Sequence, residues 1–167
     1  YKSLATSYVY FATTFTKDYA NIGITAVLTG NAKQAATFME DTTAPTLASF
    51  SVDMNTNKML LTFSEPVNLN TISIGSLTLQ NAATATTSFT LVSSTSTLPS
   101  AKVVSIAFSA SDVNSIKANA NLAKAQGSSY LVFTAGMIKD TQGVLIDAVA
   151  DGSGIQASAF TSDTTDP

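Results

Sequence analysis

Hydrophobic and polar residues alternate along much of the chain, most regularly at 47–52 and 59–63. Alternation of this kind is typical of a β-strand with one buried face. The polar stretch 53–57 predicts a turn, so these two strands should pair antiparallel. Apolar, β-branched or aromatic runs separated by Ser, Thr, Asn and Pro predict further strands at 72–79, 89–91, 103–108, 130–133 and 155–160.

One segment has helical spacing instead. Apolar residues recur every three or four positions at Val113, Ile116, Ala120 and Ala123. Ser109 or Ser111 can serve as the N-cap, and Asp112 then lies in the first turn, so we expect a short helix over about 111–124. About seven strands with turn signals roughly every 10 residues and one crossover helix predict a mostly β fold, an antiparallel sandwich.

The chain contains an internal repeat with an offset of 122 residues. The segment Glu-Asp-Thr-Thr-Ala-Pro at 40–45 recurs at 162–167 as Ser-Asp-Thr-Thr-Asp-Pro. The same offset, without a gap, matches residues of the first forty to identical residues later in the chain, among them Tyr8, Phe11, Lys17, Asp18, Ala26, Val27, Gly30, Gln34, Ala35 and Phe38.

The repeat predicts the domain organisation. We expect residues 1–40 to be the C-terminal part of one repeat, 41–162 a complete repeat, and 163–167 the linker that opens a third. A unit of about 120 residues can hold its own core, which favours an array of domains over a solenoid. Proline restricts φ and favours an extended preceding residue, so Asp-Thr-Thr-x-Pro should be a short, stiff linker. We expect the native polypeptide to be longer at both ends.

Composition excludes several chemistries. The chain has no His, Cys or Trp, and its eight basic residues are all lysines. Catalytic triads that use His or Cys, thiolate metal sites and arginine clamps are therefore excluded. A net charge of -3 with no basic patch argues against nucleic acid as a partner. The apolar runs are far shorter than the roughly 20 residues that span a bilayer, so we expect no membrane span in this segment.

Four segments in order resemble a bacterial Ig-like repeat, of the type found in S-layer proteins and large secreted adhesins. They are Asp41–Pro45, Leu60–Val67 (Leu-Leu-Thr-Phe-Ser-Glu-Pro-Val), Tyr130–Phe133 and Lys139–Gly143 (Lys-Asp-Thr-Gln-Gly). The segment Asp112–Lys117 also resembles long repeat arrays in algal and protist surface proteins. Val144 departs from the family, which often has Asn there, and Asn21 stands where the second copy has Gly143.

The resemblance implies an Ig-like β-sandwich that is extracellular, lies at the cell surface and has no enzymatic activity. Its implied role is to build a filament, layer or adhesive stalk, with neighbouring repeats as partners. These partners lie in cis or in a homopolymer, in which another chain completes the strands of residues 1–40. The alternative is a carbohydrate-binding or spacer module of a secreted enzyme.

Acidic residues near the predicted junctions are candidate Ca²⁺ ligands, because carboxylate oxygens are the donors that Ca²⁺ prefers. They are Asp41, Asp151, Asp163 and Asp166. In the favoured alternative, Asp41 and Asp163 accept backbone hydrogen bonds in Asx-turns that shape the linker. No cofactor other than Ca²⁺ is predicted.

Glu65 and Asp140 are the carboxylates that could converge for acid–base chemistry, as in a glycosidase. A structural role is the favoured interpretation: Glu65 ends a strand and Asp140 shapes a turn. The Ser- and Thr-rich stretch 84–100 is either a polar loop or a site of O-glycans.

Overall fold

The computed structural model describes residues 2–164. It divides into two compact units, residues 1–42 and the chain from Thr43 onward. The second unit is mostly β with one α-helix. None of the helices in the described part of the chain is long and apolar enough to cross a membrane.

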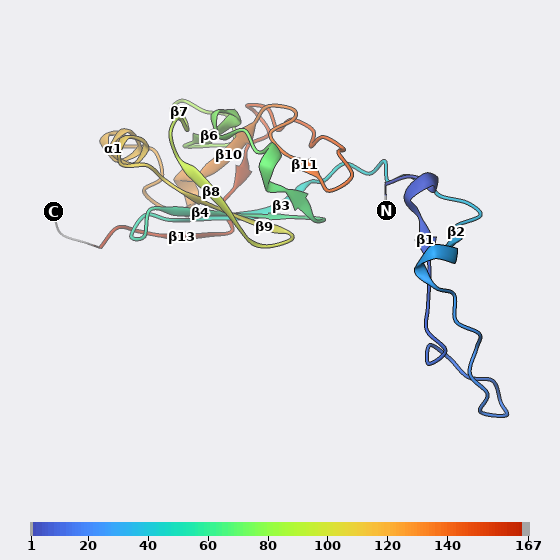
Figure 1. The fold of residues 1–167 in the computed structure, drawn as a ribbon. Helices are drawn as coiled ribbons and strands as arrows, with labels where there is room; N and C mark the ends of the chain where they lie inside the picture. The colour runs from blue at the N-terminus through green and yellow to red at the C-terminus, as the bar shows by residue number, and fades with distance from the viewer. Residues whose placement is uncertain (1, 165–167) are drawn as a thin grey trace. The chain divides into compact units, whose positions relative to one another are not determined.

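Two larger sheets form the second unit (Figure 1). One sheet has the order β13 (Ala159–Thr161), β3 (Leu47–Asp53), β4 (Lys58–Phe63), β9 (Val103–Ala107), β8 (Thr95–Ser100). The other has the order β12 (Ile155–Gln156), β10 (Tyr130–Phe133), β6 (Leu77–Gln80), β7 (Ser88–Thr90). β5 (Val67–Asn68) and β11 (Lys139–Asp140) pair separately, and α1 spans Ala110–Ala118.

The alternation of the sequence places one face of each larger sheet in a shared core. In β4, Met59, Leu61 and Phe63 are buried, while the residues between them are exposed or half-buried. Leu79 and Leu131, which face each other across β6 and β10, belong to the same hydrophobic cluster as the β4 residues. Apolar burial between the sheets therefore supplies the main stabilising term of this unit.

The predicted pairing at 47–63 is confirmed, because β3 and β4 form an antiparallel pair with Val52 opposite Met59. The turn between them is closed by Asp53, whose Oδ1 accepts hydrogen bonds from the amides of Asn55 and Thr56 at 2.9 and 3.0 Å. The strands predicted at 89–91, 103–108 and 130–133 are also present, within one residue at each end.

Four predictions of local structure were wrong in detail. Residues 74–76 form a 3-10 turn, and only 77–80 of the predicted strand 72–79 are extended. Residues 95–100 form the edge strand β8 rather than a loop, with Pro99 tolerated because an edge strand needs fewer ladder donors. The stretch 155–160 changes sheets, since β12 pairs with β10 whereas β13 runs parallel to β3. The predicted helix 111–124 ends at Ala118.

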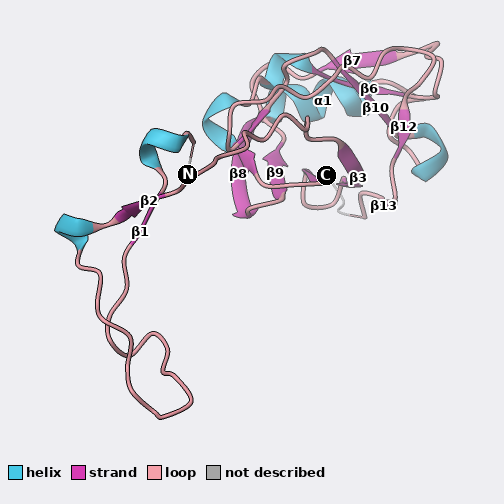
Figure 2. Ribbon diagram, turned by 90° about the vertical axis from the view of Figure 1, so that its right-hand side faces the viewer, coloured by secondary structure: helices cyan, strands magenta, loops and turns pink. Residues whose placement is uncertain are grey.

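The first unit is small and largely without regular structure (Figure 2). β1 (Tyr8–Val9) pairs with β2 (Lys33–Gln34), and isolated bridges join Phe11 to Val27 and Lys17 to Gly23. Its apolar side chains are mostly exposed, including Phe15 at 71% and Val9 at 55%. No buried apolar residue is found in the described part of this unit.

Helix α1 begins at a buried network of polar contacts. Ser109 is the N-cap, and its hydroxyl accepts a hydrogen bond from the amide of Asp112 at 3.1 Å. The buried Asp112 carboxylate accepts hydrogen bonds from the amides of Val92 and Ser93 and from the hydroxyl of Ser94, the last at 2.6 Å. Burial raises the pKa of Asp112, but these hydrogen bonds outweigh it and hold the pKa below its usual range.

The substitution Asp112→Asn should lower the free energy of unfolding by about 1–3 kcal/mol at pH 7, because an amide donor would replace an acceptor opposite buried donors. Because the folded-state pKa is lowered, the contribution of Asp112 is present above the unfolded pKa of about 3.9 and is lost as pH falls through the folded value. Urea unfolding at pH 7 and near pH 3 should therefore show a smaller difference between the two proteins at the lower pH.

The matched control is Ser115→Ala on the exposed side of the same helix, where we expect a change within about 0.5 kcal/mol. This account would be contradicted if Asp112→Asn lowered the free energy of unfolding by the same amount at both pH values.

Candidate functional site

The structure places the predicted Ca²⁺ ligands on separate parts of the chain. Asp41 is exposed, near the end of the first unit. In the second unit, Oδ1 of Asp151 accepts hydrogen bonds from Nε2 of Gln80 at 3.1 Å and the amide of Ala85 at 2.8 Å. Asp166 lies outside the described residues. Binding of Ca²⁺ by these residues stays a prediction.

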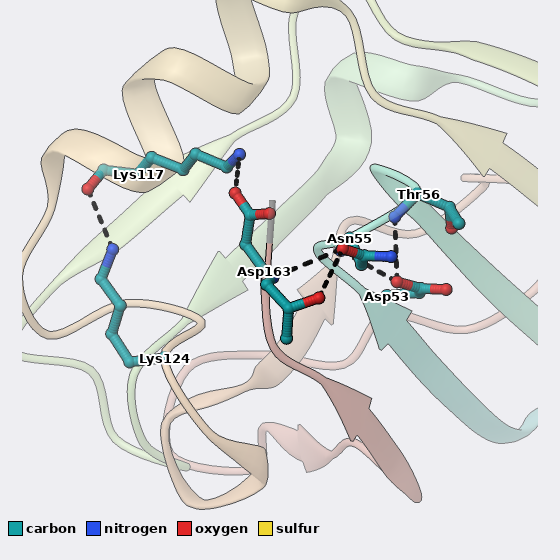
Figure 3. A network of polar contacts seen from close by, with 7 residues as sticks. Asp53, Asn55, Thr56, Lys117, Lys124 and Asp163 are labelled. Carbon is teal, nitrogen blue, oxygen red and sulfur yellow. Dashed lines mark hydrogen bonds and ion pairs between the residues drawn. The ribbon is translucent and has the colours of Figure 1, made fainter. Parts of the chain in front are cut away.

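Asp163 forms an ion pair with Lys117 of α1 (Figure 3). The next residue, Thr164, donates from its amide and its hydroxyl to Oδ1 of Asn55, at 3.3 and 3.1 Å. Asn55 is held in the β3–β4 turn by Asp53, whose pKa is lowered, chiefly by hydrogen bonds from Thr56. Two separate contacts therefore fix the end of the second unit against its helix and its first turn.

Glu65 and Asp140, in contrast, are brought together. Antiparallel pairing of β5 with β11 sets Asp140 opposite Val67, two residues after Glu65. Each of the two carboxylates offers an oxygen that lies within 4.8 Å of the other. The sequence singled out this pair for acid–base chemistry but did not predict it as a cation site.

The two oxygens of Asp140 have different environments. Oδ1 accepts backbone hydrogen bonds from Gln142, Gly143 and Val144, at 2.9, 2.5 and 2.6 Å. The residue is 1% exposed, and its Oδ2 is buried without a hydrogen-bond partner among the described residues. Burial and the three hydrogen bonds hold the Asp140 carboxylate in place, in keeping with the turn-shaping role expected for it.

The turn that follows Asp140 recurs in the first unit. Asp18, its equivalent at the 122-residue offset, accepts a hydrogen bond from the amide of Ile22 at 2.8 Å, as Asp140 does from Val144. Asn21 and Gly143 both have positive φ, 64° and 104°, so Asn replaces Gly without abolishing the turn. Asp18 is exposed, however, so only Asp140 has the buried environment of a binding site.

Comparison with known proteins gives no assignment: no protein-family model, no curated protein and no solved structure matches the chain.

The ion pair between Lys117 and Asp163 should couple by less than about 1 kcal/mol, because both side chains are partly exposed. A double-mutant cycle with Lys117→Met and Asp163→Asn, followed by urea unfolding, measures this coupling. We expect the coupling to fall towards zero in about 1 M NaCl, where the Debye length is roughly 3 Å. A coupling above about 2 kcal/mol, or one that salt leaves unchanged, would contradict a screened surface pair.

Proposed function

We propose that this chain is a structural, non-catalytic module of an extracellular tandem-repeat protein. In this proposal the second unit is an Ig-like sandwich, and the first unit is the C-terminal part of an equivalent domain. The repeated units build a filament, layer or adhesive stalk at the cell surface. The observation that carries the proposal is that the two units share one pattern of backbone pairing.

The shared pattern has the same 122-residue offset as the sequence repeat. Tyr8 pairs with Gln34 as Tyr130 pairs with Gln156. The amide of Phe11 donates to the Val27 carbonyl, as that of Phe133 does to Val149, both at 3.0 Å. Four more pairs of backbone amides, 122 residues apart, donate to carbonyls that are also 122 residues apart. These amides belong to Ser7 and Ser129, Asp18 and Asp140, Ile24 and Ile146, and Ala35 and Ala157.

The two units differ in what covers their apolar side chains. Leu131 and Met137 are fully buried in the second unit, whereas their equivalents Val9 and Phe15 are exposed. In the second unit, β6 pairs along β10 and places Leu79 opposite Leu131. Among the described residues of the first unit, no strand occupies the corresponding side of β1. The first unit has a hollow that is lined by residues from both strands and their neighbours, namely Ser7, Tyr8, Val9, Lys33, Ala35 and Phe38.

A tandem array explains both the likeness and the difference. Strands equivalent to β3–β9 of another repeat would cover the apolar side chains of the first unit, as they do in the second. The contacts of Asp163 with Lys117 and of Thr164 with Asn55 hold the last described residues against α1 and the β3–β4 turn, which supports a role in a tandem array. Low charge and the absence of His and Cys fit a role that requires no chemistry at a site.

Joining residues 41–122 directly to the start of the full chain tests the proposal. Residue 123 is equivalent to residue 1, so the junction keeps the repeat in register. We expect the added strands to complete a second sandwich and to slow amide hydrogen exchange of residues 8–35 by at least about 10³-fold, as global stability allows. Hydrogen exchange read by mass spectrometry measures the change against the original chain.

Two variants of the joined protein serve as controls. Val9→Asp, at the position equivalent to the buried Leu131, should abolish the added protection because it would place a charge in the new core. Tyr19→Asp, at a fully exposed position, should leave it unchanged. Exchange as fast as in the original chain would overturn the proposal.

A further inference from the structure

We propose that Glu65 and Asp140 form the fixed part of a Ca²⁺ site between β5 and the strand β11. None of the four residues that the sequence suggested as ligands takes part in this proposal. The site lies wholly within the second unit, and it stands independently of the proposed function.

The need for a cation arises from the buried carboxylate of Asp140. Three backbone amides satisfy its Oδ1, but no group among the described residues satisfies Oδ2, although that oxygen is buried. A buried carboxylate oxygen without a partner is costly, and an isolated buried charge costs more. A second carboxylate, that of Glu65, has an oxygen within 4.8 Å of one of the Asp140 carboxylate oxygens, and it adds like-charge repulsion. A cation bound by both carboxylates would relieve both costs.

The geometry of the pair fits Ca²⁺. Two oxygens that bind one Ca²⁺ at 2.3–2.6 Å can be at most about 5 Å apart, which includes the spacing of Glu65 and Asp140. All donors offered by these side chains are hard carboxylate oxygens, and the chain has no His or Cys that would favour a softer metal. The three amides that hold Oδ1 fix Asp140 in place, while Glu65 is half-buried and therefore lies partly open to solvent.

The pairing of β5 with β11 explains how the site is preorganised. The two strands have Asp140 opposite Val67 and Lys139 opposite Asn68. Further support for this pair comes from Thr71, whose hydroxyl accepts a hydrogen bond from the amide of Lys139 at 2.9 Å. Two protein carboxylates are few for Ca²⁺, so we expect a dissociation constant of roughly 0.1–1 mM, in the range of extracellular modules.

The test uses the full chain at pH 7, freed of metal with EDTA and titrated with CaCl₂ at constant ionic strength. Isothermal titration calorimetry measures binding, and thermal unfolding measures stabilisation. We expect one site in the range given above and a Tm that rises with Ca²⁺ up to about 10 mM. MgCl₂ should be at least about tenfold less effective, because Mg²⁺ demands a tighter octahedron and gives up its waters reluctantly.

Glu65→Gln should weaken Ca²⁺ binding at least about tenfold, because it removes one of the two ligand charges without disturbing the turn held by Asp140. Asp140→Asn should abolish binding, but it also alters the turn, so Glu65→Gln is the decisive variant. The matched control is Asp18→Asn, which changes the equivalent turn of the first unit and should leave Ca²⁺ binding unchanged.

Three results would overturn the proposal. The first is no heat of binding and no shift of Tm at about 10 mM Ca²⁺. If Glu65→Gln bound Ca²⁺ as tightly as the native chain does, the ion would lie elsewhere. If Mg²⁺ bound the native chain and raised its Tm as strongly as Ca²⁺ does, the assignment to Ca²⁺ would be overturned.

Discussion

The second unit depends on the burial of two apolar sheet faces against one another. The strands that supply these faces come from distant parts of the repeat: β3, β4, β6 and β9 precede the helix, whereas β10, β12 and β13 follow it. β13 enters the larger sheet beside β3, the first strand of the unit, so the sheet contains both ends of the repeat. A segment with only the late strands would keep their local pairing but could not bury their apolar side chains, and the first unit has such a pairing with its apolar side chains mostly exposed.

Two buried aspartates show how the protein places charge inside this fold. Asp112 and Asp140 are both almost completely buried, and both accept several backbone hydrogen bonds at the start of a turn or helix. At Asp112 both oxygens have donors, so the carboxylate is satisfied within the chain. At Asp140 only Oδ1 has them, and a second carboxylate lies near. Asp112 therefore has a structural role, whereas Asp140 points to a bound cation.

The sequence predicted those features that follow from local pattern. Alternation located β3 and β4, and the two candidate capping residues, Ser109 and Ser111, located the start of α1 to within one residue. The early end of the helix at Ala118 was missed, because the apolar spacing continues to Ala123 although the backbone there has a positive φ of 51°. The polar strand β8 was missed because its place beside β9, rather than its own pattern, makes it extended. The sequence named Glu65 and Asp140 as carboxylates that could converge, but it did not show how they meet, because this depends on the long-range pairing of β5 with β11.

The proposed function treats residues 41–162 as a mechanical unit of a tandem repeat. Stretching a polypeptide of tandem copies of this segment by single-molecule force spectroscopy tests it most directly. The account predicts equally spaced unfolding events, each of which lengthens the molecule by about 400 Å, the extended length of a 122-residue repeat less its folded span. A smooth extension without discrete events, or events of irregular and much shorter length, would contradict it.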